Sequence, residues 1–227
     1  MKKTKQKFYQ SLVLIILLIS ACAPSYVPNV VNTPLLSNKG EFQVTANAAL
    51  SGFDPQLSYA VTDNIGLMVN GSFANQTSDS TDDYHKHQFV ELGAGYYKKI
   101  GQRVRFEGYG GLGFGNLESN DDDALFIPFS SVKTTRVFLQ PTIGATTEIF
   151  DGSFSSRFVV VNMKQDLHSD IGYFIEPVLT SRLGYKYVKV VTQFGVSIPL
   201  NSEIDFGYEP FIFSIGLQLN LGKLYDE

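Results

Sequence analysis

The chain has 227 residues, a formal net charge of −4, a single cysteine and no tryptophan. Its acidic balance argues against nucleic acid as a partner, because contacts with phosphates require clustered basic side chains, and one cysteine excludes an internal disulfide. With 18 phenylalanine, 12 tyrosine and 20 glycine residues, the composition favours an all-β protein.

The first residues form a basic head followed by an apolar run. Four lysines precede the run from Leu12 to Leu18, and Ser20 and Ala21 stand directly before Cys22. A basic head, an apolar run and small residues in this order are typical of a secretory signal. The apolar run is too short for a spanning helix. Its end resembles the bacterial lipoprotein processing box, which implies that Cys22 receives a diacylglycerol and an acyl chain such as palmitate. We therefore expect removal of residues 1–21, lipidation at Cys22 and no other cofactor.

The next stretch contains three prolines and no regular period. Pro24, Pro28 and Pro34 interrupt residues 23–39, which favours an extended linker. We expect residues 22–39 to be a lipidated periplasmic tether, residues 40–222 to be the folded domain and residues 223–227 to be a periplasmic tail.

Beyond the tether, apolar and polar residues alternate with a period of two, which indicates strands with one apolar face. The segment lengths match the roughly 9–11 residues that a tilted strand needs to cross a bilayer. After Cys22 there is no apolar stretch of the roughly 20 residues that a spanning helix requires. Ten segments follow this alternation, near 41–50, 54–62, 65–75, 87–99, 103–116, 132–149, 154–163, 173–185, 188–199 and 209–221.

The connections alternate between short turns and longer polar loops, as in outer-membrane barrels. We therefore predict a closed, antiparallel, up-and-down transmembrane β-barrel of about ten strands, with eight strands as the alternative. A soluble sandwich or lipocalin-like barrel also alternates, but its apolar face points inward. Here the apolar face is continuous enough to surround the barrel. Aromatic residues occur on that face near the strand ends, where they suit a bilayer interface: Tyr59, Tyr96, Tyr173, Tyr185 and Phe211.

The opposite face carries five carboxylates and six cations, which we expect to form an ion-pair network in the lumen. A barrel of this size is nearly filled by its own side chains, so a filled lumen is favoured over a narrow, porin-like pore. The predicted network comprises Glu41, Glu91, Arg103, Arg105, Glu107, Arg136, Glu148, Arg157, Glu176, Arg182 and Lys189.

The predicted external loops contain histidines and acids. In an extended segment His85 and His87 lie on one side, a spacing that can bind zinc or copper with a third ligand. His168 and acids such as Asp79, Asp82 and Asp121 fall in the same loops. There are two alternatives to a metal site: the loop charges are simply solvated, or the acidic loops bind an extracellular ligand. No pattern of catalytic residues is evident, so we expect no enzyme; a hydrolytic or metal site in the loops is the less favoured reading.

The runs Asn32–Glu41, Gly52–Phe53 and Gln56–Asn70 resemble lipid-anchored β-barrel proteins of the Bacteroidota outer membrane. The resemblance implies the outer membrane of a Gram-negative bacterium, with the N-terminus lipid-anchored on the periplasmic side. It also implies outer-membrane lipid and the barrel assembly machinery as partners, and a structural or surface-interaction role without catalytic residues. Ser214–Leu221 is similar to the last-strand signal of such barrels, although it ends on leucine and six residues follow it.

Overall fold

The computed structural model describes residues 24–77, 84–120, 131–165, 168–201, 204 and 206–224. The predicted signal segment and Cys22 lie outside these residues. In the described part of the chain, no helix is long and apolar enough to cross a membrane.

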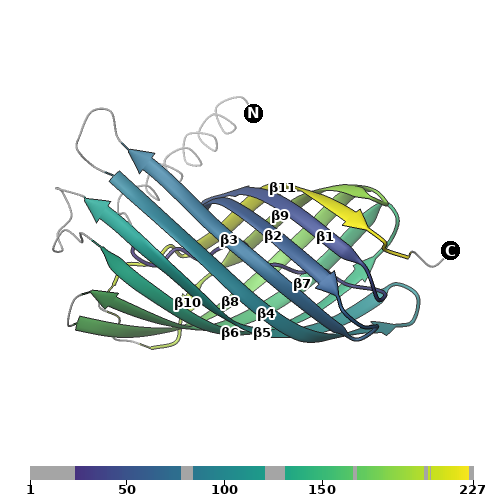
Figure 1. Ribbon diagram of the computed structural model, residues 1–227, viewed down its shortest axis with the longest axis horizontal. Coiled ribbons are helices and arrows are strands. Elements are labelled where there is room, and N and C mark those ends of the chain that lie inside the picture. The colour runs from purple at the N-terminus through teal and green to yellow at the C-terminus, as the bar shows by residue number, and fades with distance from the viewer. Residues whose placement is uncertain are drawn as a thin grey trace, which may run out of the picture.

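Ten strands form one closed antiparallel barrel (Figure 1). Each strand pairs with its neighbours along the chain from β1 to β9; β9 then pairs with β11, and β11 returns to β1. The two-residue β10 continues the line of β9 beside β8. The predicted ten-stranded barrel is confirmed, and the alternative prediction of eight strands is wrong. The strands are β1 (Phe42–Ala49), β2 (Gly52–Ala60), β3 (Ile65–Thr77), β4 (Tyr84–Ile100), β5 (Val104–Asn120), β6 (Val132–Thr146), β7 (Phe150–Gln165), β8 (His168–Tyr185), β9 (Val188–Val196), β10 (Ile198–Pro199) and β11 (Phe211–Leu221).

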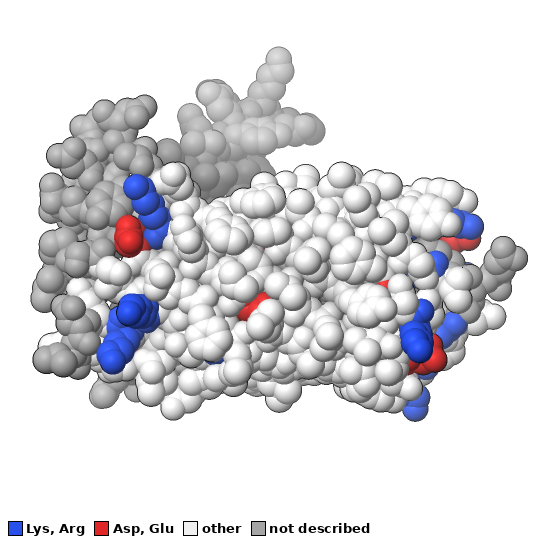
Figure 2. All heavy atoms as spheres, viewed as in Figure 1, with Lys and Arg blue, Asp and Glu red and all other residues white. Residues whose placement is uncertain are grey.

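The barrel wall has its apolar side outside and its polar side inside. Leu139 and Leu179 are each 60% exposed on the outer face, whereas Glu91 and Glu107 are fully buried in the lumen. Figure 2 shows charged side chains gathered at the two ends of the barrel, with a largely uncharged band between them. This distribution is the reverse of that in a soluble sandwich, whose apolar faces meet in the core.

The two ends of the barrel differ. Short turns connect β2 to β3, β4 to β5, β6 to β7 and β8 to β9, and the pair Phe42 and Leu221 lies at this short-turn end. The other end, called the long-loop end below, carries the longer connections between β3 and β4, β5 and β6, and β10 and β11, together with the short ones between β1 and β2 and between β7 and β8. Strands β4 to β8 have 15–18 residues, against 8 or 9 in β1, β2 and β9. One side of the wall is therefore taller than the other.

The N-terminal segment of residues 25–37, called the luminal segment below, lies inside the barrel. Tyr26, Val30 and Val31 are each 1% exposed, and Leu35 and Leu36 are fully buried. Figure 1 shows this purple stretch running lengthwise within the wall. The expected tether is thus extended but does not lie outside the domain. The physical reason is space: a barrel of about eight strands is just filled by its own side chains, and ten strands leave additional room.

Candidate functional site

The barrel lumen binds the backbone of the luminal segment through side chains of the wall. An extended chain without a strand partner leaves its N–H and C=O groups unpaired, which is costly in a buried place. Here six consecutive carbonyls, from residue 30 to residue 35, each accept a hydrogen bond from a different side chain. The donors are Gln56 to Val30, Gln193 to Val31, Gln140 to Asn32, Arg182 to Thr33, Gln43 to Pro34 and Lys223 to Leu35.

Backbone N–H groups of the same segment donate to acceptors on the wall. Gln193 binds both backbone groups of Val31. The Val31 N–H donates to Gln193 Oε1, and Gln193 Nε2 donates to the Val31 carbonyl, each at 2.8 Å. In all, four N–H groups of the segment donate to side-chain acceptors. The acceptors are Asp54 for Val30, Gln193 for Val31, Glu107 for Leu36 and Glu41 for Ser37, at 2.7 or 2.8 Å.

A buried charge cluster surrounds Asn29 of the luminal segment. Glu91 pairs with Arg157, and its second oxygen accepts a hydrogen bond from Asn29 Nδ2 at 2.9 Å. Asn29 Oδ1 accepts from Arg136 Nη1 at 3.1 Å and from Arg157 Nη1 at 3.3 Å. The Asn29 amide thus lies within the ion-pair network and forms hydrogen bonds both with the carboxylate and with the two guanidinium groups. These bonds connect the segment to β4, β6 and β7.

Apolar contacts hold the segment at three levels. At the long-loop end, Tyr26 stacks on Phe174 with ring centroids 4.4 Å apart, and its hydroxyl donates to Glu176. In the middle of the lumen, Val31 packs with Val178 and Ile212. Leu36 packs with Ala60 and Tyr97 near the short-turn end. The wall also leaves room for Leu35 at Gly144, because a Cβ at that position would lie 2.8 Å from both δ carbons of Leu35.

Nine of the eleven charged residues predicted for the lumen are buried there. Arg103 instead lies exposed in the turn before β5, and Glu148 lies in the turn before β7, where it pairs with Lys186 at 2.9 Å. The prediction that both lie in the lumen is wrong because alternation no longer dictates the direction of a side chain beyond the strand ends. The nine are Glu41, Glu91, Arg105, Glu107, Arg136, Arg157, Glu176, Arg182 and Lys189.

Two kinds of luminal residue were missed. Asp151 pairs with Lys189 at 2.8 Å, and Lys223 lies 3.4 Å from Glu41, so two further charges belong to the network. Sequence reasoning also passed over the neutral glutamines Gln43, Gln56, Gln140 and Gln193, which make the backbone contacts described above. Their signal was present: each occupies an inward-facing strand position, where a buried amide needs hydrogen-bond partners.

His85 and His87 lie on the inner side of β4 near the long-loop end. His85 Nε2 is 3.1 Å from His87 Nδ1, and His87 Nε2 is 3.1 Å from Ser72 Oγ. Two nitrogens on a tetrahedral zinc ion lie about 3.3 Å apart for Zn–N bonds of about 2.0–2.1 Å. Among the described residues, no cluster of three histidines, cysteines or acids can hold a metal. His168 is exposed at the start of β8, and Asp79, Asp82 and Asp121 lie outside the described residues.

A zinc titration of the folded barrel tests this histidine pair. We expect weak, saturable binding that is at least about tenfold weaker when His85 and His87 are both replaced by alanine, because two imidazole ligands are lost. Isothermal titration calorimetry measures the difference, with His168→Ala as the matched control. Identical isotherms for the wild type and the double variant would remove the histidine pair as a metal site.

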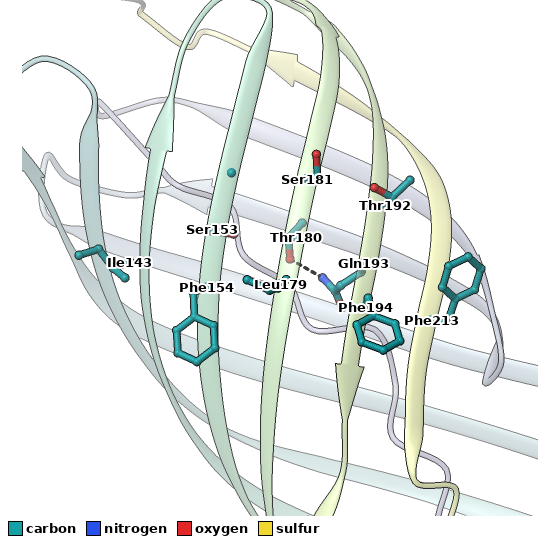
Figure 3. Close-up of a pocket in the computed structure, with 11 residues that line it drawn as sticks. Ile143, Ser153, Phe154, Leu179, Thr180, Ser181, Thr192, Gln193, Phe194 and Phe213 are labelled. Atoms are coloured by element: carbon teal, nitrogen blue, oxygen red, sulfur yellow. Dashed lines mark hydrogen bonds between the residues drawn. The ribbon is translucent and has the colours of Figure 1, made fainter.

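A separate hollow of about 580 Å³ opens on the outer face between β7, β8, β9 and β11. Figure 3 shows Phe154, Phe194 and Phe213 around it and the hydrogen bond from Gln193 to Thr180, 2.9 Å long, in the wall. None of the residues that line it is charged, a histidine or a cysteine. It is a depression in the apolar outer surface.

The lumen, occupied along its length by the protein's own chain, is therefore the best-built polar site of the barrel. Its contacts are directed mainly at backbone groups and at Asn29, so they hold an extended peptide in one register. Comparisons of the sequence with protein-family models and with curated proteins find no match.

Proposed function

We infer that the protein is a small outer-membrane β-barrel lipoprotein with a structural or surface-interaction role and a closed lumen. The observation that carries this proposal is the luminal segment, whose six consecutive carbonyls are bound by side chains from around the barrel. A segment held in this way closes the interior to solutes. This favours a closed barrel over a narrow pore, and it leaves the external surface as the place for interactions.

The outer surface supports insertion into a bilayer. Large apolar side chains are exposed all around the wall, among them Leu112, Leu139, Leu179 and Phe194, which are 50–60% exposed. In water this area would be costly, whereas hydrocarbon accommodates it, and a closed barrel satisfies all of its strand hydrogen bonds. Tyr96 and Tyr185 are exposed near the short-turn end, as expected for aromatic residues at a membrane interface.

Two further parts of the proposal come from the sequence. Cys22 is proposed as the lipidated residue because of the segment before it, and the barrel assembly machinery as the factor that inserts the strands. We propose a non-catalytic role, with an extracellular ligand at the acidic loops as the interaction that the barrel would support.

Replacement of Cys22 tests whether the barrel itself holds the protein in the membrane. We expect a Cys22→Ser chain, exported behind an unrelated cleavable signal, to remain in the outer-membrane fraction after extraction with urea at high pH. The physical reason is that the apolar wall, rather than an acyl chain, supplies most of the buried area.

Two measurements accompany this fractionation. Migration on SDS gels before and after heating reports whether the barrel is folded, and the unreplaced chain behind its own signal is the control. A folded Cys22→Ser protein recovered in the soluble periplasmic extract would contradict the proposed membrane barrel.

A further inference from the structure

The luminal segment runs from one end of the barrel to the other. At the short-turn end, Lys39 N–H donates to Asp63 in the turn between β2 and β3, and Asn38 Nδ2 donates to the carbonyl of Gly222 after β11. At the long-loop end, Tyr26 N–H donates to the carbonyl of Gly207, and its own carbonyl accepts from Glu209 N–H. Residues 24 and 38 therefore lie at opposite ends of the lumen.

The length of the segment is sufficient to cross a membrane. A fully extended chain advances about 3.3 Å per residue, so the stretch from Tyr26 to Asn38 can reach at most about 40 Å. The hydrocarbon core of a bilayer is about 30 Å thick. A segment of this length can therefore connect the two sides of a bilayer through the lumen.

The packing at the long-loop end sets the direction in which the chain leaves. Tyr26 lies in an apolar cluster with Phe174, Phe206 and Tyr208, and Arg136 lies over its ring at 4.7 Å. The Cα of Pro24 lies against Gly207 in the connection between β10 and β11. These side chains fill the lumen beside Tyr26, so the described chain reaches the long-loop end of the lumen at Pro24.

We propose that the barrel carries its N-terminal segment across the membrane and displays the chain before Pro24 on the long-loop side, opposite to the C-terminus. This proposal rests on the proposed membrane barrel and deepens it. Cys22 precedes Pro24 by two residues, a reach of about 7 Å, so a lipid on its thiol would enter the leaflet on the long-loop side. This side differs from the periplasmic side that the expected tether implied.

Three epitope-tagged chains test the direction in intact cells. The first carries the tag between Ala23 and Pro24, the second in the connection between β5 and β6, and the third after Glu227. We expect antibody to label the first two chains on intact cells and to label the third only after the outer membrane is permeabilised. Heat-dependent migration on SDS gels confirms that each tagged barrel is folded.

The outcomes separate the two proposals. Labelling of the β5–β6 tag without labelling of the tag before Pro24 would overturn the threaded direction and leave the membrane barrel intact. A folded chain whose β5–β6 tag is hidden in intact cells would overturn the proposed orientation of the barrel itself, and the display of the N-terminus with it.

A disulfide provides a second measurement if the inserted tag prevents folding. Thr33 Oγ1 in the luminal segment lies 3.3 Å from Ser153 Oγ on β7, close enough for two cysteine sulfurs to bond after a small shift. In a Cys22→Ser chain, we expect Thr33→Cys and Ser153→Cys to form an intramolecular disulfide in most of the folded protein, detected by mass spectrometry. Thr33→Cys combined with Thr192→Cys, on the outer face of β9, is the control that should not crosslink. A folded double variant without the Thr33–Ser153 crosslink would contradict the placement of the segment in the lumen.

Discussion

Removal of residues 24–37 should convert a silent barrel into a conducting one. In planar bilayers the intact protein should show no steady current steps, because the luminal segment occupies the interior along its length. Without that segment, the side chains that bind it lose their partners and become hydrated, and water fills the space. Single-channel recording of the refolded proteins measures this change, which we expect to run from background current to steady open steps.

The matched control removes residues 225–227, which follow the barrel and leave Lys223 in place; this chain should remain silent. If the deleted protein folds poorly, a synthetic peptide of residues 24–38 supplied with it should restore folding and close the conductance. The binding groups for that peptide lie on the wall and remain in the deleted chain. Steady open steps from the intact protein, or a folded deletion variant that stays silent, would contradict the closed lumen.

The strands were predictable because their signal is local. In β11, Phe213 and Ile215 are about half exposed on the outer face, and Ser214 and Gln218 are buried in the lumen. Each residue's direction follows from the pleat alone, so alternation within ten residues suffices. The same rule failed at Arg103 and Glu148, which lie in turns. There the backbone leaves the pleat, and the parity of the sequence position no longer decides which way a side chain points.

The luminal segment was not predicted, since it has no periodic pattern and no strand partner. Its contacts are with single side chains on many strands, such as Gln56 on β2 and Gln140 on β6, which no local pattern in the segment can indicate. A signal did exist in its composition. Val30, Val31, Leu35 and Leu36 are apolar, and a tether in water has no need of them. Together with inward-facing glutamines on several strands, these residues point to an occupied interior.

Replacement of Glu91 should strongly destabilise the barrel. Glu91 and Arg157 are at most 1% exposed. Glu91→Ala leaves the arginine without its ion-pair partner and removes the acceptor of Asn29 Nδ2. Breaking a buried ion pair from one side costs about 3–5 kcal/mol. We therefore expect a loss of this order in the free energy of unfolding, measured by urea titration of the refolded barrel with far-ultraviolet circular dichroism.

Two other variants serve as controls for Glu91→Ala. Glu148→Ala removes the same charge from an exposed pair with Lys186, and its midpoint in urea should be nearly unchanged because water screens that pair. Glu91→Gln keeps an acceptor for Asn29 and removes the negative charge, so its midpoint should lie between those of the wild type and Glu91→Ala. Since Asn29 joins Glu91 to the luminal segment, Glu91→Ala should also raise the frequency of open steps in bilayer recordings. Equal midpoints for Glu91→Ala and Glu148→Ala would show that the buried network neither supports the barrel nor holds the segment in it.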